Sequence, residues 1–186
     1  MKKSLLLTLA ILLAVSASNA QVGGSFGIFA DPAGANCEIA DTSAALCNVY
    51  IVHVNASAVS AAEFGVSAPT CILAPFLSYT PLFAVDIGFN PAAPLEGRSV
   101  GYGGCATSPV HVATLGYFCQ GLTTPCCYQA IIPHAGNGQI GTVDCSSNLL
   151  SAAGGEAIWS AQSGCNCDVV NRASTWGAVK EMFHEN

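Results

Sequence analysis

Positive charge is scarce in this chain. Its 186 residues include five Lys and Arg against eleven Asp and Glu. Two of the five cations, Lys2 and Lys3, stand at the very start, so removal of a leader leaves three cations against eleven acids and a formal net charge of −8 with histidine neutral. Nucleic acids and anionic membranes both select clustered Lys and Arg. The composition therefore argues against both as partners.

Long apolar runs are missing after the first twenty residues. Lys2 and Lys3 precede the apolar run Leu5–Val15, and Ser18-Asn19-Ala20 then gives a small-x-small cleavage pattern. This layout predicts a secretory signal over residues 1–20. The apolar run is short for a bilayer span, and no later stretch has the length and apolarity of a stop-transfer segment. We expect a secreted or cell-surface protein with no stable membrane span after cleavage.

A long helical periodicity is also missing; short alternating segments take its place. In one segment Val110, Val112, Thr114 and Gly116 alternate with His111, Ala113, Leu115 and Tyr117, a period of two that predicts a half-buried strand. In Asn48–Asn55 a second strand is expected, with Val49, Ile51 and His53 on one side and Tyr50, Val52 and Val54 on the other. Further strands are expected at 23–30, 71–78, 82–89 and 99–105, while Glu63-Phe64 suggests a short strand or one helical turn. Residues 128–132 and 139–145 predict a hairpin turning at Asn137-Gly138.

Eight to ten short strands separated by Gly, Pro and Asn turns predict an all-β protein. The expected fold is a disulfide-rich antiparallel β-sandwich with immunoglobulin-like topology, occupying residues 21–170, followed by a short C-terminal helix. The order of the strands does not follow from the sequence.

Cysteine is abundant, with ten residues behind the predicted signal. An even number in an exported chain indicates a disulfide framework of up to five bridges. Adjacent cysteines have Cα atoms about 3.8 Å apart, below the usual disulfide range, so Cys126 and Cys127 should bond to different partners. The same argument separates Cys165 from Cys167. The framework comprises Cys37, Cys47, Cys71, Cys105, Cys119, Cys126, Cys127, Cys145, Cys165 and Cys167.

Residues 171–186 differ from the rest of the mature chain. A polar connector precedes Ser174 and Thr175, either of which can cap a helix from Trp176 to about Phe183. Trp176, Val179 and Phe183 fall on one face. Two helical turns are not stable alone, so this face must dock either on its own domain or on another partner.

Several motifs resemble catalytic signatures without their context. Gly23–Gly27 matches G-x-S-x-G, but only two mature residues precede it, whereas a nucleophile elbow follows a strand. Gly136–Gly141 matches G-x-G-x-x-G, but the next residues read as a strand and not as a helix. Cys165-x-Cys167 admits a redox or zinc pair, which is less common in exported chains than two disulfide halves. Asn55-Ala56-Ser57 is a glycosylation sequon, meaningful only in a host that glycosylates.

The histidines and acids leave one enzymatic hypothesis open. His53 and His111 lie mid-strand between valines and could approach each other, although a histidine hydrogen-bonded in or beside the core is the commoner case. No H-x-H, HExxH or CxxC spacing supports a metal, and the acids form no calcium loop. We predict no catalytic residues, no metal and no cofactor.

Several runs carry a resemblance: GIFADPAGANC, VYIVHVN, SVGYGGC, SPVHVATLGYF, TPCCY and GQIGTVDC. Together they resemble small uncharacterised secreted cysteine-rich bacterial proteins from environmental genomes. The tail STWGAVKEMF is similar to Thr-Trp-Gly-x-x-Lys segments that end otherwise unrelated exported bacterial proteins. The resemblance implies a bacterial origin and supplies no site residue. It also raises the idea that residues 174–186 form a sorting or docking tail.

The leading functional hypothesis is a non-enzymatic secreted module for binding, adhesion or extracellular assembly. Its partner would be a protein or glycan at the cell surface, or further copies of itself. The alternative is a small secreted hydrolase or metal-dependent enzyme that uses His53 or His111 with an acid such as Asp86 or Asp144.

Overall fold

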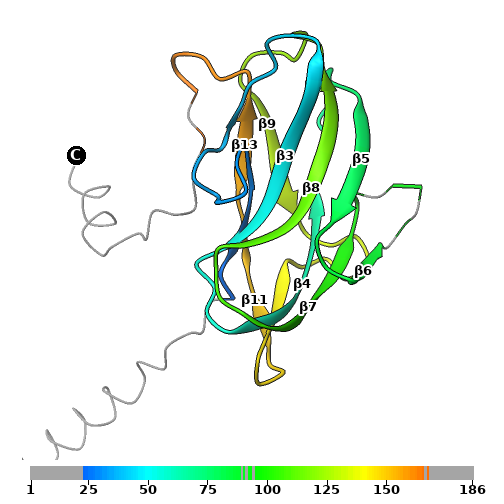
Figure 1. Ribbon diagram of the computed structural model, residues 1–186, viewed down its shortest axis with the longest axis vertical. Coiled ribbons are helices and arrows are strands. Elements are labelled where there is room, and N and C mark those ends of the chain that lie inside the picture. The colour runs from blue at the N-terminus through cyan, green and yellow to red at the C-terminus, as the bar shows by residue number, and fades with distance from the viewer. Residues whose placement is uncertain (1–22, 89, 91, 94, 166, 168–186) are drawn as a thin grey trace, which may run out of the picture.

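A computed structural model describes residues 23–88, 90, 92–93, 95–165 and 167, and this part of the chain is all β, in two sheets that face each other (Figure 1). The predicted disulfide-rich β-sandwich is confirmed. Thirteen strands occur among the described residues, more than the eight to ten expected, because several are only two to four residues long. The predicted signal, the C-terminal connector and the helix lie outside the described residues.

The first sheet contains five strands, with β3 and β8 at its centre. Their pairing is antiparallel and extends from Ala45↔Cys119 to His53↔Val110. Only the edge pair β1–β12 is parallel. In order across the sheet the strands are β12 (Ala153–Gly154), β1 (Ser25–Phe29), β3 (Ala45–Val54), β8 (Val110–Cys119) and β5 (Phe76–Pro81).

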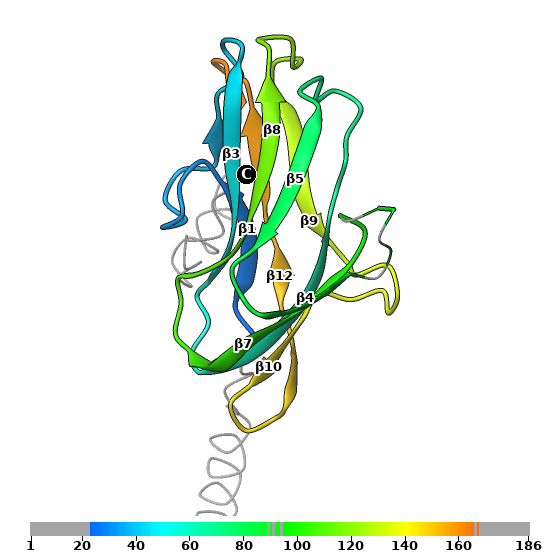
Figure 2. The ribbon, with the colours of Figure 1, turned by 45° about the vertical axis from the view of Figure 1, so that its right-hand side comes forward.

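The second sheet is built around β4 (Val59–Val66) and lies behind the first (Figure 2). One side of β4 pairs with β7, which in turn pairs with β6. The other side pairs with β10 and, further along, with β9. The remaining members are β6 (Val85–Gly88), β7 (Arg98–Ala106), β10 (Gly141–Asp144), β11 (Leu149–Ser151), β9 (Cys127–Ile132), β13 (Glu156–Trp159) and β2 (Glu38–Ile39).

The predicted hairpin between β9 and β10 is wrong. Both strands are antiparallel to β4, and they follow one another along the same edge of it: Ile131 and Ile132 pair with Val66 and Gly65, and Gly141 then pairs with Glu63. Residues 133–140 therefore form an excursion that leaves this edge and returns to it. Gly138 does have the positive φ that was expected of it, 72°, but the chain resumes its original direction instead of reversing.

A β-bulge changes the inward face of β8. The pairing shifts between Ile51 and Val52, which places Val112 and Ala113 together in the core and leaves Leu115 and Tyr117 as the next inward residues. The simple alternation expected over Val110–Tyr117 therefore holds on each side of the bulge but changes phase across it. On β3, Val49, Ile51 and His53 share one face, as the alternation predicted, and all three are fully buried.

Five disulfides fasten this sandwich, as the even cysteine count predicted. Cys126 and Cys127 bond to different partners, and so do Cys165 and Cys167. The suggestion that Cys165 and Cys167 form a redox or zinc pair is therefore wrong. The bridges are Cys37–Cys167, Cys47–Cys119, Cys71–Cys127, Cys105–Cys145 and Cys126–Cys165.

Candidate binding surface

His53 is part of the core. Its Nε2–H donates to the carbonyl oxygen of Gly23 at 2.7 Å, so Nδ1 accepts from the Tyr102 hydroxyl at 2.9 Å. The ring also stacks on Phe26, with centroids 4.1 Å apart. Burial lowers the pKa of His53 to about 4, although the hydrogen bond to Gly23 opposes that shift. A neutral imidazole with both nitrogens paired stabilises the core and presents nothing to solvent.

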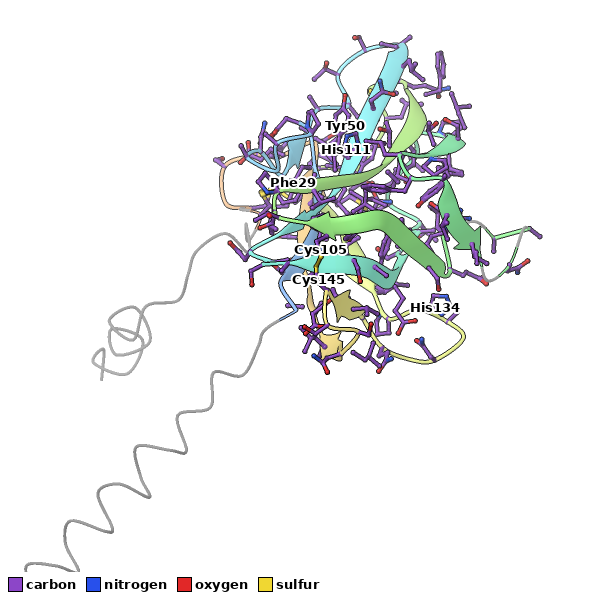
Figure 3. All side chains as sticks on the ribbon, turned by 60° about the horizontal axis from the view of Figure 1, so that its bottom comes forward. Phe29, Tyr50, Cys105, His111, His134 and Cys145 are labelled. Atoms are coloured by element: carbon purple, nitrogen blue, oxygen red, sulfur yellow. A yellow bond between two sulfur atoms is a disulfide. The ribbon has the colours of Figure 1, made fainter. Side chains whose placement is uncertain are left out.

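His111 occupies the opposite face of the same sheet. It pairs with Val52, whose side chain also points away from the core between the two sheets. The His111 ring packs edge-on against the Tyr50 ring, with centroids 5.2 Å apart (Figure 3). Its Nε2 lies 3.2 Å from the carbonyl oxygen of Ala113 and 3.1 Å from the Thr114 hydroxyl. The sheet separates the two histidines, so the approach suggested for His53 and His111 does not occur.

The acids named with these histidines have separate roles. Asp86 accepts from the Tyr79 hydroxyl at 2.7 Å and forms an ion pair with Arg98, whose guanidinium lies over the Tyr79 ring. This network joins β5 of one sheet to β6 and β7 of the other. Asp144 accepts from backbone N–H groups in the β10–β11 turn. Neither acid hydrogen-bonds a histidine, so the positions proposed for the enzymatic alternative do not form one site.

Metal-binding and membrane-spanning features can be examined over the same described residues. No group of three or more His, Cys, Asp or Glu side chains among them has a geometry that could hold a metal ion. None of them forms a helix with the length and apolarity of a membrane span. Asn55 of the sequon is exposed, in the turn between β3 and β4. The candidate docking residues Trp176, Val179 and Phe183, and His184, lie outside the described residues.

The outer face of the second sheet carries an apolar hollow of about 280 Å³. Strand register aligns its residues in two rows, one that crosses five strands, from β6 through β7, β4 and β10 to β11, and one that crosses the first four of them. We call this hollow the trough. One row is Val85, Gly101, Ala61, Val143 and Leu149; the other is Ile87, Ser99, Glu63 and Gly141.

Side-chain size gives the trough its shape. The three middle strands contribute small residues such as Gly101, Ala61 and Gly141, which form a low floor. The flanking strands contribute Val85 and Ile87 on one wall and Leu149 on the other, with 55%, 65% and 61% of their surfaces exposed. A Cβ on Gly101 would lie 3.3 Å from that of Val85, so the wall leans over the floor.

Charge within the trough is limited to Glu63. Its Oε1 accepts from the Gln139 side chain at 2.8 Å, and no other lining residue is charged. Among the described residues eight acids accompany one Lys or Arg, namely Arg98, which is already paired with Asp86. The trough is thus an apolar surface with a single carboxylate in a negatively charged domain.

Sequence reasoning missed the trough. The strand over 82–89 was expected, but the outward position of Val85 and Ile87 depends on which strand lies beside them. The available signal was the run of small residues at alternate positions, Ser99 and Gly101 in one strand and Gly141 before Val143 in another. Only the β4 register brings these runs into line.

No protein-family model and no curated protein matches the chain. Among solved structures it is similar to cohesin modules. The sixth cohesin of Acetivibrio cellulolyticus scaffoldin B, solved in complex with a Cel5 dockerin variant, has 12% sequence identity and a TM-score of 0.49, covering 76% of this chain and 100% of that one. The cohesin module of a Clostridium perfringens family 33 glycoside hydrolase has 9% identity and a TM-score of 0.47, covering 76% and 99%. A non-cellulosomal cohesin from Archaeoglobus fulgidus has 14% identity and a TM-score of 0.42, covering 88% and 100%.

Proposed function

We propose that this chain is a non-enzymatic extracytoplasmic binding or assembly module and that its partner docks in the trough. The observation that carries the proposal is the uncovered, largely apolar trough that spans five registered strands. Contiguous exposed apolar surface on a soluble domain commonly marks an interaction site. The five disulfides support an oxidising location outside the cytoplasm.

The dimensions of the trough favour a helix as the docking element. Its walls stand four strand spacings apart, which is about 19 Å between backbones. An α-helix with its side chains is about 10–12 Å across, so it fits between Val85 and Leu149 once those side chains fill the remaining space. The small floor residues allow the helix to approach the sheet closely. Helix-in-groove recognition by an apolar face has this geometry.

Charge and polarity favour a basic protein over a glycan or a second copy. A glycan would bury hydroxyl groups against a lining that offers few polar partners and no aromatic ring. A second copy would bring two negatively charged surfaces together. A helix with a Lys or Arg positioned to meet Glu63 satisfies both the apolar lining and the carboxylate.

A displayed library of amphipathic helices tests this function without knowledge of the natural partner. The oxidised mature protein is used to select binders, and their affinity is then measured for two variants. Ala61→Leu fills the trough floor; Thr80→Leu adds the same side chain on exposed β5 of the other sheet. We expect the first variant to weaken binding at least tenfold and the second to leave it unchanged, because only the first displaces the helix.

The selection also has an outcome that overturns the proposal. If the selected helices bind Ala61→Leu as tightly as the natural sequence, the trough is not the binding surface. The proposal also fails if every selected helix binds without using the trough, or if the library yields no binder. Thermal unfolding of both variants checks that neither substitution has disturbed the fold.

A further inference from the structure

One disulfide differs from the other four in its exposure. Each of the other four bridges has at least one buried cysteine. These buried residues are Cys37, Cys119, Cys127 and Cys165. Cys105 and Cys145 are both exposed (Figure 3). Thiol–disulfide exchange requires direct approach of a thiolate to one sulfur, so access governs which bridge reacts first.

The exposed bridge links the two strands that flank β4. Val59 of β4 pairs with Ala106 of β7 on one side and with Asp144 of β10 on the other. Along β7 the register then moves from Ala106 to Gly101 while β4 advances only from Val59 to Ala61. The extra residues of β7 form an arch, residues 102–105, and Cys105 at its end reaches Cys145, with the two Cα atoms 5.6 Å apart.

The two ends of this bridge differ in support. Asp144 fixes the turn that carries Cys145 by accepting N–H groups of Ser146 and Asn148 at 2.8 Å each, and the Cys145 N–H donates to the carbonyl oxygen of Ala58. The arch holds Gly103 and Gly104, and a Cβ added to either would meet nothing within 4 Å. Gly103 also has a φ of 73°, a conformation that glycine adopts without strain. Tyr102, at the start of the arch, is buried and hydrogen-bonds His53, so release of the bridge would free Gly103, Gly104 and Cys105.

The bridge is continuous with the trough. Gly101, on the floor, is the residue before the arch, and Val143 lies two residues before Cys145. The covalent link thus joins the arch of β7 to the residue after β10 beside the middle of the row Val85, Gly101, Ala61, Val143 and Leu149. It adds a covalent tie to the backbone pairing through which β4 holds these two strands on either side of the floor residue Ala61.

We propose that Cys105–Cys145 is a redox latch for the trough. An extracytoplasmic dithiol attacks one exposed sulfur, the Cys105–Cys145 bond breaks, and the second thiol of the reductant resolves the mixed disulfide. Two electrons pass to the bridge, which becomes two cysteine thiols, and the dithiol becomes a disulfide. The end of the arch then leaves the turn after β10 and the trough loses its shape beside the bridge, while four bridges keep the sandwich folded. The effect on binding rests on the proposed function; the selective reduction does not.

Limited reduction tests the selective step. The full oxidised protein is treated with increasing dithiothreitol, free thiols are blocked with N-ethylmaleimide, and modified cysteines are identified by peptide mapping. We expect Cys105 and Cys145 to be modified at least tenfold faster than the other eight, with the far-ultraviolet circular dichroism unchanged. Earlier modification of another pair, or simultaneous modification of all ten, overturns the latch.

Two further readouts separate the latch from the proposed function. Selective reduction, or the double substitution Cys105→Ser and Cys145→Ser, should weaken binding of a trough-dependent helix about tenfold and accelerate amide hydrogen exchange in residues 101–106. Unchanged exchange in that segment overturns the latch even if no helix has been selected. If amide exchange in residues 101–106 becomes faster but the helix affinity does not change, the bridge does not control binding. The trough would still be the binding surface in that case.

Discussion

The outer faces of the two sheets both carry apolar side chains, and on the first sheet the cluster around Val52 is covered, although Leu46 and Phe118, paired at the other end of that sheet, are 64% and 39% exposed. On the first sheet Phe29, Val52 and Val54 form a buried cluster with Cys37. The chain after β1 folds back over them, and a Cβ on Gly34 would lie 3.2 Å from Val54 and 3.3 Å from Val52. On the second sheet Val85, Ile87 and Leu149 remain exposed.

The difference distinguishes apolar surface used for folding from apolar surface kept for a partner. The covered face is closed by the chain itself, and Cys37–Cys167 ties the cover down. The trough has the same kind of side chains, small residues that leave room above them, and no cover among the described residues. Substitutions on the first face should therefore cost stability, and substitutions on the second should cost binding.

The largest expected effect compares Phe29→Ala with Ile87→Ala. Phe29 is buried, and its ring lies against Gly27, so its removal leaves a cavity and should cost about 3–5 kcal/mol of unfolding free energy. Ile87 is 65% exposed, and its truncation should change stability by less than about 0.5 kcal/mol. Chemical denaturation with the disulfides intact measures both. Equal losses would erase the distinction between the two faces.

The next effect compares the core histidine with the surface histidine as pH falls. His53 has a pKa of about 4 when folded and its ordinary 6.5 when unfolded, so the unfolded chain binds the proton more readily between these values. Its contribution, about 3 kcal/mol, is fully present above pH 6.5 and is lost as pH falls toward 4. The slope should largely disappear in His53→Gln and persist in His111→Gln. Denaturation curves from pH 7 to 4 decide this, and an unchanged slope in His53→Gln would contradict it.

A third comparison uses two carboxylates that organise turns. Asp41 accepts the N–H groups of Gln120, Gly121 and Thr123; Asp144 accepts those of Ser146 and Asn148. Burial raises the pKa of Asp41, but hydrogen bonds led by the Thr123 hydroxyl outweigh it and lower the pKa overall. Hydrogen bonds from Asn148 lower that of Asp144. Replacement of Asp41 by Ala should cost about 1–2 kcal/mol, and replacement of Asp144 by Ala should also lower stability.

These two substitutions should differ in binding. Asp144→Ala loosens the turn that positions Leu149, the far wall of the trough, and should weaken a trough-dependent helix severalfold. Asp41→Ala lies in a different loop and should leave that affinity unchanged. Calorimetric titration of both variants with the helix separates general destabilisation from damage to the trough. If both variants lost affinity equally, the loss would reflect general destabilisation and not the trough.

The smallest expected effect concerns Glu63→Gln. The side chains are nearly equal in size, so stability and apolar contact should be retained. Affinity for a basic helix should fall about threefold to fivefold at low salt and little at high salt, because the exposed ion pair is screened. Titration at two salt concentrations measures this. If the affinity of Glu63→Gln and that of the natural sequence depend on salt to the same extent, the partner has no cationic residue that pairs with Glu63. The trough would still be the binding surface.

Much of the fold could be predicted because its signals are local. The alternation places Val49, Ile51 and His53 on one face of their strand, and the spacing of Cys126 and Cys127 excludes a mutual bond. What could not be predicted depends on pairing between distant strands. The bulge in β8 shifts the inward set to Leu115 and Tyr117, and the course of β10 along β4 replaces the expected hairpin.

The candidate site belongs to this second group. Gly101 and Ala61 are forty residues apart in sequence, and neither carries a chemical group that would single it out. They form a floor only because β7 and β10 both pair with β4. His53 and His111, whose chemistry does single them out, lie on opposite faces of one sheet and form no common site.

The most direct test of the trough is a map of backbone amide chemical shifts on addition of a helix selected from the library. Shifts concentrated at Ala61, Gly101, Gly141 and Val143, with the covered cluster around Val52 unperturbed, are the predicted result. Shifts centred on the outer face of the first sheet, with the four trough residues unaffected, would contradict it.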